Sequence, residues 1–137
     1  MSARPMVRPA RPEDAARVGA FLSAHMNPRI PAEVFARILD YPWQAPRPHL
    51  GMLAELGGEV VGYHGCVWSR RRAARFGSFS SLYVRRDMRG EDLGGRMMRA
   101  ITAEAGPTLT VFHPSRRVHD LLEACGFRDL DTHRRVW

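Results

Sequence analysis

The stretch from Val84 to Ile101 has the residue types and spacing of a turn that binds phosphate and then opens a helix. It reads VRRDMRGEDLGGRMMRAI. The first amides of a helix lack partners within it, and the helix dipole favours negative charge, so such a turn can hold a phosphate group. Asp92, however, places a carboxylate where such turns usually have a glycine. We expect this side chain to cap the helix by accepting hydrogen bonds from its amides, and so to compete with a phosphate.

Three further side chains are candidates for acid–base chemistry. His113 is a candidate general base because imidazole side chains can exchange a proton near neutral pH, although a histidine at a strand end can equally be bonded to backbone. His64, within GYHGCVW, can face either side of a sheet and is interpreted as a packed or surface residue. Tyr83 could supply a hydroxyl, but strand alternation does not fix its direction. The six histidines form neither an HExxH motif nor zinc-type spacing with cysteine, so no metal is expected.

Composition indicates a soluble globular chain with a basic surface. The length of 137 residues suits a single domain, 1–137, with one core. The net charge of +7 comes from 21 arginines and favours anionic partners, but the sequence shows no pattern typical of nucleic-acid recognition, which is considered unlikely. The arginine-rich segment 70–75 could bind an anion or simply be solvated. With no apolar membrane span and no secretory signal, we expect a cytoplasmic protein with two reduced cysteines.

Apolar periodicity and turn residues predict an α+β fold, in which helices and an antiparallel meander carry these side chains. Pro12 opens the first helix, three prolines in 42–48 exclude regular structure there, and Gly57–Gly58 predicts a hairpin turn. The expected elements, in order, are a strand at 6–10, helices after 12 and at 31–40, strands at 50–56, 59–68 and 76–84, a helix at 92–104, a strand at 108–113, a helix at 115–126 and a strand pair or its remnant at 127–137.

Four segments in this order resemble the GNAT superfamily of acyl-CoA-dependent N-acyltransferases. They are VRPARPEDAARVGAFL, LAELGGEVVGY, LYVRRDMRGEDLGGRMM and LLEACGF, which together extend over nearly the whole chain. The resemblance implies a mixed, mostly antiparallel central sheet flanked by about four helices. It also implies acetyl-CoA as co-substrate and a small-molecule or peptide amine as acceptor, with no membrane partner. A homodimer is an open alternative to a monomer.

The resemblance also assigns a binding region for acetyl-CoA. The family signature [QR]-x-x-G-x-[GA] aligns with Arg89 first, Asp92 in place of the central glycine and Gly94 last. The cradle implied for the pyrophosphate therefore runs through Arg89, Gly90, Glu91, Asp92, Leu93, Gly94 and Gly95. Backbone groups of Leu82, Tyr83 and Val84 correspond to the family's pantetheine contacts, and Ser115 corresponds to an asparagine that follows the fifth strand.

Two proton-transfer groups of the family are replaced. Ser80 stands where many relatives have a glutamate base, and Leu122 stands where many have a tyrosine acid. Serine cannot act as a base at neutral pH without a partner, although it can orient a water. His113, Ser80 and Tyr83 are therefore the catalytic candidates. Two hypotheses follow: an N-acetyltransferase that uses acetyl-CoA, or a GNAT-fold ligand-binding or protein-interaction module that has lost catalysis.

Overall fold

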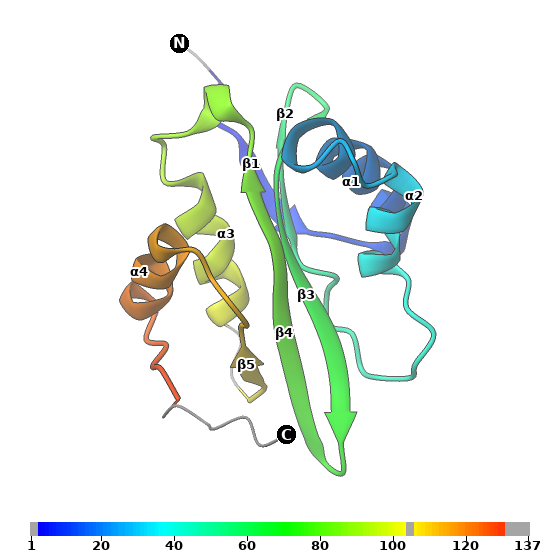
Figure 1. Ribbon diagram of the computed structural model, residues 1–137, viewed down its shortest axis with the longest axis vertical. Helices are drawn as coiled ribbons and strands as arrows, with labels where there is room; N and C mark the ends of the chain where they lie inside the picture. The colour runs from blue at the N-terminus through cyan, green and yellow to red at the C-terminus, as the bar shows by residue number, and fades with distance from the viewer. Residues whose placement is uncertain (1–2, 104–105, 131–137) are drawn as a thin grey trace.

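A five-stranded mixed sheet forms the centre of the protein in a computed structural model that describes residues 3–103 and 106–130. The strands lie in the order β1-β2-β3-β4-β5, with antiparallel pairing from β1 to β4 and parallel pairing of β4 with β5. Their bounds are Met6–Pro9, Met52–Leu56, Glu59–Arg71, Ala74–Val84 and Thr108–Thr110. The β3–β4 hairpin is long and projects beyond the other strands (Figure 1).

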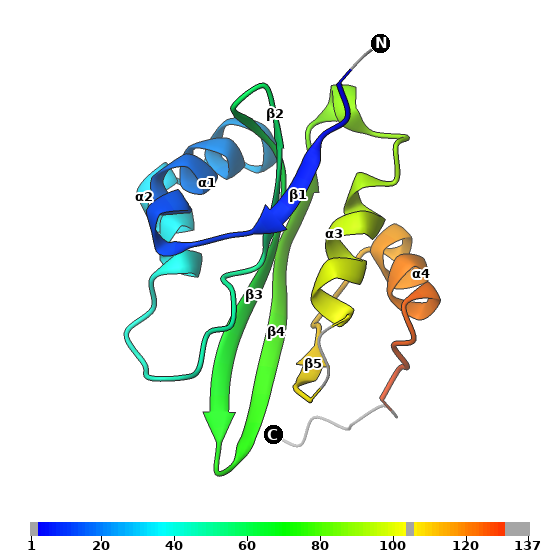
Figure 2. The same ribbon diagram turned by 180° about the vertical axis from the view of Figure 1, so that it is seen from behind.

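Four helices cover the two faces of the sheet. Helices α1 (Ala15–Phe21) and α2 (Ala32–Phe35) lie on one face, and α3 (Leu93–Thr102) and α4 (Arg116–Ala124) lie on the other, as Figure 2 shows. Helix α3 buries Leu93, Met97, Met98 and Ile101, whose spacing places them on one helix face. The predicted fold, a mixed and mostly antiparallel sheet flanked by about four helices, is confirmed.

Several turns have the local geometry that their residues predict. Gly57 and Gly58 both have positive φ, at 59° and 81°, as two-residue hairpin turns require, and they join β2 to β3. Pro12 opens a short 3-10 helix, Pro12–Asp14, that leads into α1. Within the proline-rich segment, the indole of Trp43 donates a hydrogen bond to the Trp68 carbonyl at 2.7 Å, which covers the outer edge of β3.

Other elements are shorter or more irregular than the sequence predicts. The second helix continues past α2 only as a 3-10 turn, Ala36–Leu39, and the strand expected to reach 113 ends at Thr110. Helix α1 runs into a π-helical turn, Leu22–Met26, that the periodicity does not indicate. Residues 127–130 form no strand, and the rest of the predicted final pair lies outside the described residues. Within the described residues, neither Cys66 nor Cys125 is part of a disulfide. No described helix is long and apolar enough to cross a membrane.

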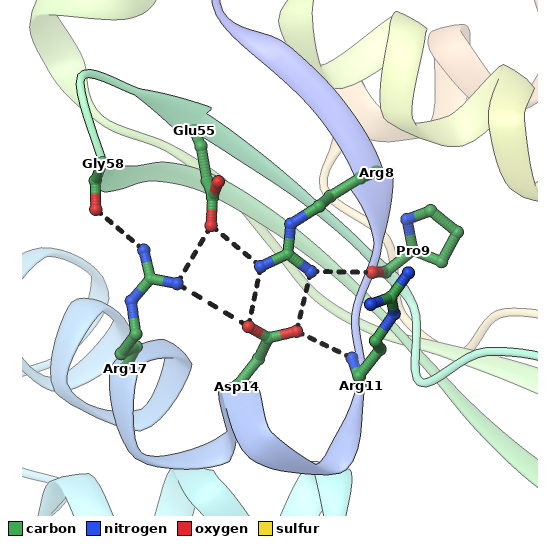
Figure 3. Close-up of polar contacts among 7 residues, drawn as sticks. All are labelled: Arg8, Pro9, Arg11, Asp14, Arg17, Glu55 and Gly58. Carbon is green, nitrogen blue, oxygen red and sulfur yellow. Dashed lines mark hydrogen bonds and ion pairs between the residues drawn. The ribbon is translucent and has the colours of Figure 1, made fainter.

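An ion-pair network connects β1, the start of α1 and β2 (Figure 3). The guanidinium of Arg8 contacts both carboxylate oxygens of Asp14, at 2.8 and 2.9 Å, and also Glu55 at 2.9 Å. Arg17 bonds to the same Glu55 oxygen at 2.9 Å. Because Asp14 is nearly buried, its carboxylate depends on these donors, and the Arg8 hydrogen bonds hold the pKa of Asp14 below its usual value.

The strand that leads to the site, β4, is irregular at one point. Tyr63 pairs with Tyr83, whereas Gly65 pairs with Ser80, so two residues of β4 face His64 alone. This is a β-bulge, and Ser81 within it has a φ of 47°. On its other edge, β4 pairs with β5 only from Phe76 to Ser78, so the later part of β4 extends past the last pair.

Candidate functional site

A cavity of about 260 Å³ lies where β4 extends past β5; we call it the splay cavity. Four segments line it: β3 at His64, the bulged part of β4, the chain between β5 and α4, and the first turn of α4. The lining residues are His64, Phe79, Ser80, Ser81, Leu82, Val111, Phe112, His113, Pro114, Ser115 and Val118. The structure therefore brings four predicted site residues together, namely Ser80, Leu82, His113 and Ser115.

His113 and Ser115 enter this cavity from the turn before α4. His113 is exposed and has a φ of 52°, so the chain bends sharply there rather than continuing β5. Ser115 is the N-cap of α4, and its hydroxyl accepts a hydrogen bond from the Val118 amide at 3.3 Å. A capping role therefore accounts for the Ser115 side chain without a ligand, while its role at the cofactor stays a prediction.

Tyr83 does not share this cavity. A Cβ built on Gly94 would lie 3.9 Å from both Leu82 and Val84, so these two side chains face α3. The ring of Tyr83, between them in sequence, lies 6.2 Å from the ring of Phe21 on α1. The structure thus places the ring of Tyr83 and the imidazole of His113 at different cavities, on opposite faces of β4. Backbone contacts from Leu82, Tyr83 and Val84 to a pantetheine arm stay predicted.

The turn between β4 and α3 has a backbone suited to an anion. Gly90 and Asp92 have φ values of 95° and 55°, and Glu91 between them is exposed. The first helical bond of α3 runs from the Arg96 amide to the Asp92 carbonyl at 2.9 Å, so the amides of Leu93, Gly94 and Gly95 precede it. Unpaired amides at the start of a ten-residue helix can bind a phosphate group.

The expectation that the Asp92 carboxylate caps these amides is wrong. Asp92 is the N-cap residue, but its side chain forms no capping hydrogen bond and instead pairs with Arg99 at 2.5 Å. The carboxylate lies against Gly95, where a Cβ would collide with it. A residue that caps with its side chain usually has extended backbone, whereas Asp92 has left-handed backbone, with φ 55° and ψ 31°. The spacing of Asp92, Gly95 and Arg99, three and then four residues apart, places them on one face of a helix. This spacing could have been recognised in the sequence.

Arg89, the first residue of the signature, lies beside the turn with its side chain held in place. Its Nε donates to the Val84 carbonyl at 3.1 Å, and its guanidinium lies 5.1 Å from the centre of the Tyr83 ring. The residue is exposed. A cation in this position is available to an anion at the turn, so a role in binding pyrophosphate stays a prediction.

His64 lines the splay cavity, although its sequence position gave no sign of this. It is 1% exposed, its ring packs edge-on against Phe79 at 4.4 Å, and its Nδ1 lies 3.1 Å from the Gly65 carbonyl. Burial lowers the pKa of His64 to about 4, so the ring is neutral at pH 7. The Ser80 hydroxyl is also buried, and no described residue bonds to it. The β4 bulge brings these residues to the cavity, and bulges have no reliable sequence signal.

A second cavity, of about 530 Å³, lies on the other face of β4; we call it the Arg86 cavity. It is lined by Ala24, His25, Tyr83, Arg85, Arg86 and Asp87. The first two belong to the π-helical turn after α1, Tyr83 lies near the end of β4, and the other three lie in the turn that follows this strand. The two cavities therefore lie on opposite sides of one strand.

Among the described residues, one group of side chains could bring metal-type ligands together. Atoms of His119, Glu123 and Asp129 lie within 4.8 Å of one another at the surface. The Nε2 of His119 is bonded to Asp129 at 2.8 Å, and this carboxylate raises the pKa of the histidine. An ion-pair cluster explains the arrangement without a metal.

The arrangement of sheet and helices is that of an acyltransferase fold, and comparison with known proteins identifies the family. Residues 19–127 match the acetyltransferase (GNAT) family, so the chain belongs to that family. A search of curated proteins finds no match.

Solved acetyltransferase structures share the fold at low identity. A ribosomal-protein-alanine N-acetyltransferase from Brucella melitensis biovar Abortus 2308 is 17% identical with a TM-score of 0.69, and the alignment covers 96% of this chain and 98% of that one. A predicted acetyltransferase with acetyl-CoA from Clostridium acetobutylicum is 14% identical with a TM-score of 0.70, covering 97% and 96%. An aminoglycoside acetyltransferase from an uncultured soil metagenomic sample, in complex with sisomicin, is 12% identical with a TM-score of 0.67, covering 97% and 95%. Family and fold together support acetyl transfer in general.

Proposed function

We infer that this protein transfers an acetyl group from acetyl-CoA to an amine. The main support for this proposal is that three features follow one another along β4. They are the unpaired amides at the start of α3, a strand segment that extends past β5, and a cavity at the bulge. An extended molecule with a pyrophosphate, an amide-rich arm and a thioester needs an anion site, strand-like backbone partners and a small cavity. The chain offers these three in that order.

The residues at the turn fit a pyrophosphate. The amides of Leu93, Gly94 and Gly95 would hold it, with Arg89 as a nearby cation. The backbone of Leu82, Tyr83 and Val84 would hold the pantetheine arm, which leaves the thioester at the splay cavity. The acetyl group could then lie between Leu82 and Val111, away from bulk water.

At the cavity, the amine nitrogen would form a bond to the thioester carbonyl carbon. The carbon–sulfur bond breaks, CoA leaves as a thiolate that takes up a proton, and the nitrogen gives up one proton. His113 is the proposed acceptor of that proton, because its imidazole lines the cavity and is exposed, and histidine is the side chain that most often acts as a general base. Holding thioester and amine together supplies much of the rate even where proton transfer is inefficient.

One observation favours the alternative, a ligand-binding or interaction module without catalysis. Leu122, which stands at the family's tyrosine position, is buried in the core and cannot donate a proton to the leaving thiolate. The Ser80 hydroxyl, at the glutamate position, is buried too. A module of this kind would bind acetyl-CoA or a partner yet release no CoA in the presence of amines.

Thermal unfolding with acetyl-CoA, and CoA release in the presence of amines, test the two functions together. A ligand at 100 times its Kd adds about 2.7 kcal/mol of stability, so a clear rise in Tm is expected with acetyl-CoA. Arg89→Ala should weaken CoA more than acetyl-pantetheine, because only CoA carries the pyrophosphate. Stabilisation without CoA release supports a module that binds acetyl-CoA, and no stabilisation at millimolar acetyl-CoA favours an interaction module over the enzyme.

A further inference from the structure

The Arg86 cavity has the position that a second substrate requires. Tyr83 lines it on one face of β4, and its neighbour Leu82 lines the splay cavity on the other. Its volume of about 530 Å³ is within the ~300–1,000 Å³ typical of small-molecule sites. A molecule in this cavity would leave the proposed acetyl-CoA groove open, and the two cavities contact β4 at adjacent residues, Leu82 and Tyr83.

The walls of this cavity are fixed by packing. The Tyr83 ring has Phe21 at 6.2 Å and the Arg89 guanidinium at 5.1 Å, and His25 packs on the same Phe21 at 5.2 Å. The turn that presents His25 is held by the Ser23 hydroxyl, which donates to the Ile30 carbonyl at 2.7 Å. These contacts give the cavity an aromatic wall and a rigid rim before any ligand binds.

The charges on the rim are not balanced. Arg85 is bound by both oxygens of Asp87, at 2.6 and 2.9 Å, and by Glu59 at 3.2 Å, so its charge is compensated. Arg86, the next residue, is exposed and forms no ion pair with any residue in 3–103 or 106–130. The carboxylate of Asp87 is already used by Arg85. The uncompensated group in the lining is therefore a guanidinium, which binds carboxylate or phosphate oxygens in pairs.

We propose that the Arg86 cavity binds the amine acceptor, and that this acceptor carries a carboxylate or phosphate group in addition to its amine. The anionic group lies at Arg86, the apolar part packs on Tyr83, and the amine extends along β4 toward the thioester. This assignment rests on the proposed acetyl transfer, and it narrows the acceptors from amines in general to amines with an anionic group.

Matched acceptors test the assignment with wild-type protein. 6-Aminohexyl phosphate is compared with 6-aminohexanol, and 6-aminohexanoate with 6-aminohexanamide, by CoA release under saturating acetyl-CoA. The anionic member of at least one pair should have a kcat/KM at least ~10-fold higher, mainly through a lower KM. The pair with the larger ratio distinguishes phosphate from carboxylate. Equal rates within both pairs would overturn the proposal.

Arg86→Gln is the matched variant, and Arg72→Gln at the exposed tip of the β3–β4 hairpin is its control, because both remove one arginine charge. Arg86→Gln should reduce the preference for the anionic acceptor toward unity, whereas Arg72→Gln should keep it. If Arg86→Gln instead weakens acetyl-CoA binding in calorimetry and leaves the preference intact, Arg86 belongs to the cofactor site and the proposal is wrong.

Binding measured without acetyl-CoA separates this proposal from the proposed function. Titration of 6-aminohexyl phosphate and 6-aminohexanoate should shift the amide signals of His25 and Arg86 in NMR spectra of the wild type, but not of Arg86→Gln. Should the protein acetylate no amine while these shifts appear, acetyl transfer fails and the anion-binding cavity stands. If neither probe shifts those signals, the cavity assignment fails, whatever the outcome with acetyl-CoA.

Discussion

The Asp92–Arg99 pair allows the proposed pyrophosphate site to be tested one charge at a time. Its two side chains lie 2.5 Å apart at the first turn of α3, where the cofactor's phosphates would bind. In the intact pair, the repulsion from Asp92 and the attraction from Arg99 nearly cancel at that site. We therefore expect Arg99→Gln to weaken acetyl-CoA, Asp92→Asn to tighten it, and the double variant to return close to wild type.

The magnitude follows from the exposure of the pair. The Asp92 and Arg99 side chains are 60% and 54% exposed, so the effective dielectric constant is closer to that of water than to that of a protein interior. At roughly 6 Å and a dielectric constant of about 40–80, one unit charge acts on each phosphate charge by about 0.7–1.4 kcal/mol, a factor of about 3–10 in Kd. Asparagine tolerates the left-handed backbone of Asp92, so the substitution keeps the turn intact.

Calorimetric titration of acetyl-CoA into the four proteins, at about 50 mM and about 300 mM salt, measures these effects, which should shrink as salt screens them. Glu13→Gln is the control, because this exposed acid precedes α1 on the other side of the sheet. Its removal should change Kd by less than twofold. If both single variants at α3 also stay within twofold at low salt, the pyrophosphate does not bind at the start of this helix.

Three further substitutions test the site and its support. His113→Ala should lower kcat by at least ~10²-fold with acetyl-CoA affinity retained in calorimetry, and unchanged kcat would remove His113 from the reaction. Asp14→Asn should cost about 2–4 kcal/mol of unfolding free energy in urea at pH 7. Because Arg8 lowers the folded pKa of Asp14, that stability is present above pH ~4 and is lost as the pH falls through the folded pKa, so the variant should lack this acid-dependent loss. Gly95→Ala should lower Tm when Asp92 is present, because the new methyl group meets the Asp92 carboxylate. In an Asp92→Gly background the same substitution should raise the free energy of unfolding by about 0.5–1 kcal/mol. A stability change of the same sign in both backgrounds would contradict the contact.

The sequence predicted the helices and turns that depend mainly on interactions between residues close together in the chain. The apolar face of α3, the glycine pair at 57–58 and the prolines of 42–48 act through their own backbone and nearest neighbours, so their patterns indicated a helix, a hairpin turn and an irregular segment. The ends of helices and strands differ from the predicted ones where packing between distant segments determines them. Strand β5 ends at Thr110, before the apolar residues Val111 and Phe112, because the chain there bends toward α4.

The features that shape the site were less accessible to sequence reasoning. The β4 bulge depends on how β3 and β4 pair, and a serine at position 81 does not signal a positive φ. That bulge decides that Ser80 and Leu82 line one cavity while Tyr83 faces the other. Asp92 was interpreted from its neighbours in the turn, whereas its side chain is controlled by Arg99, seven residues further along.

The side chains of the splay cavity favour direct attack by the amine over a covalent acyl-enzyme. A covalent route needs a nucleophile beside a base, and the lining offers the hydroxyls of Ser80, Ser81 and Ser115 but no cysteine. The hydroxyl of Ser80 is buried, and that of Ser115 caps α4. With cavities on both faces of β4, thioester and amine can be held at the same time, so neither has to leave before the other binds. If both proposed sites hold, we expect acetyl transfer to proceed through a ternary complex, in which β4 determines the distance between donor and acceptor.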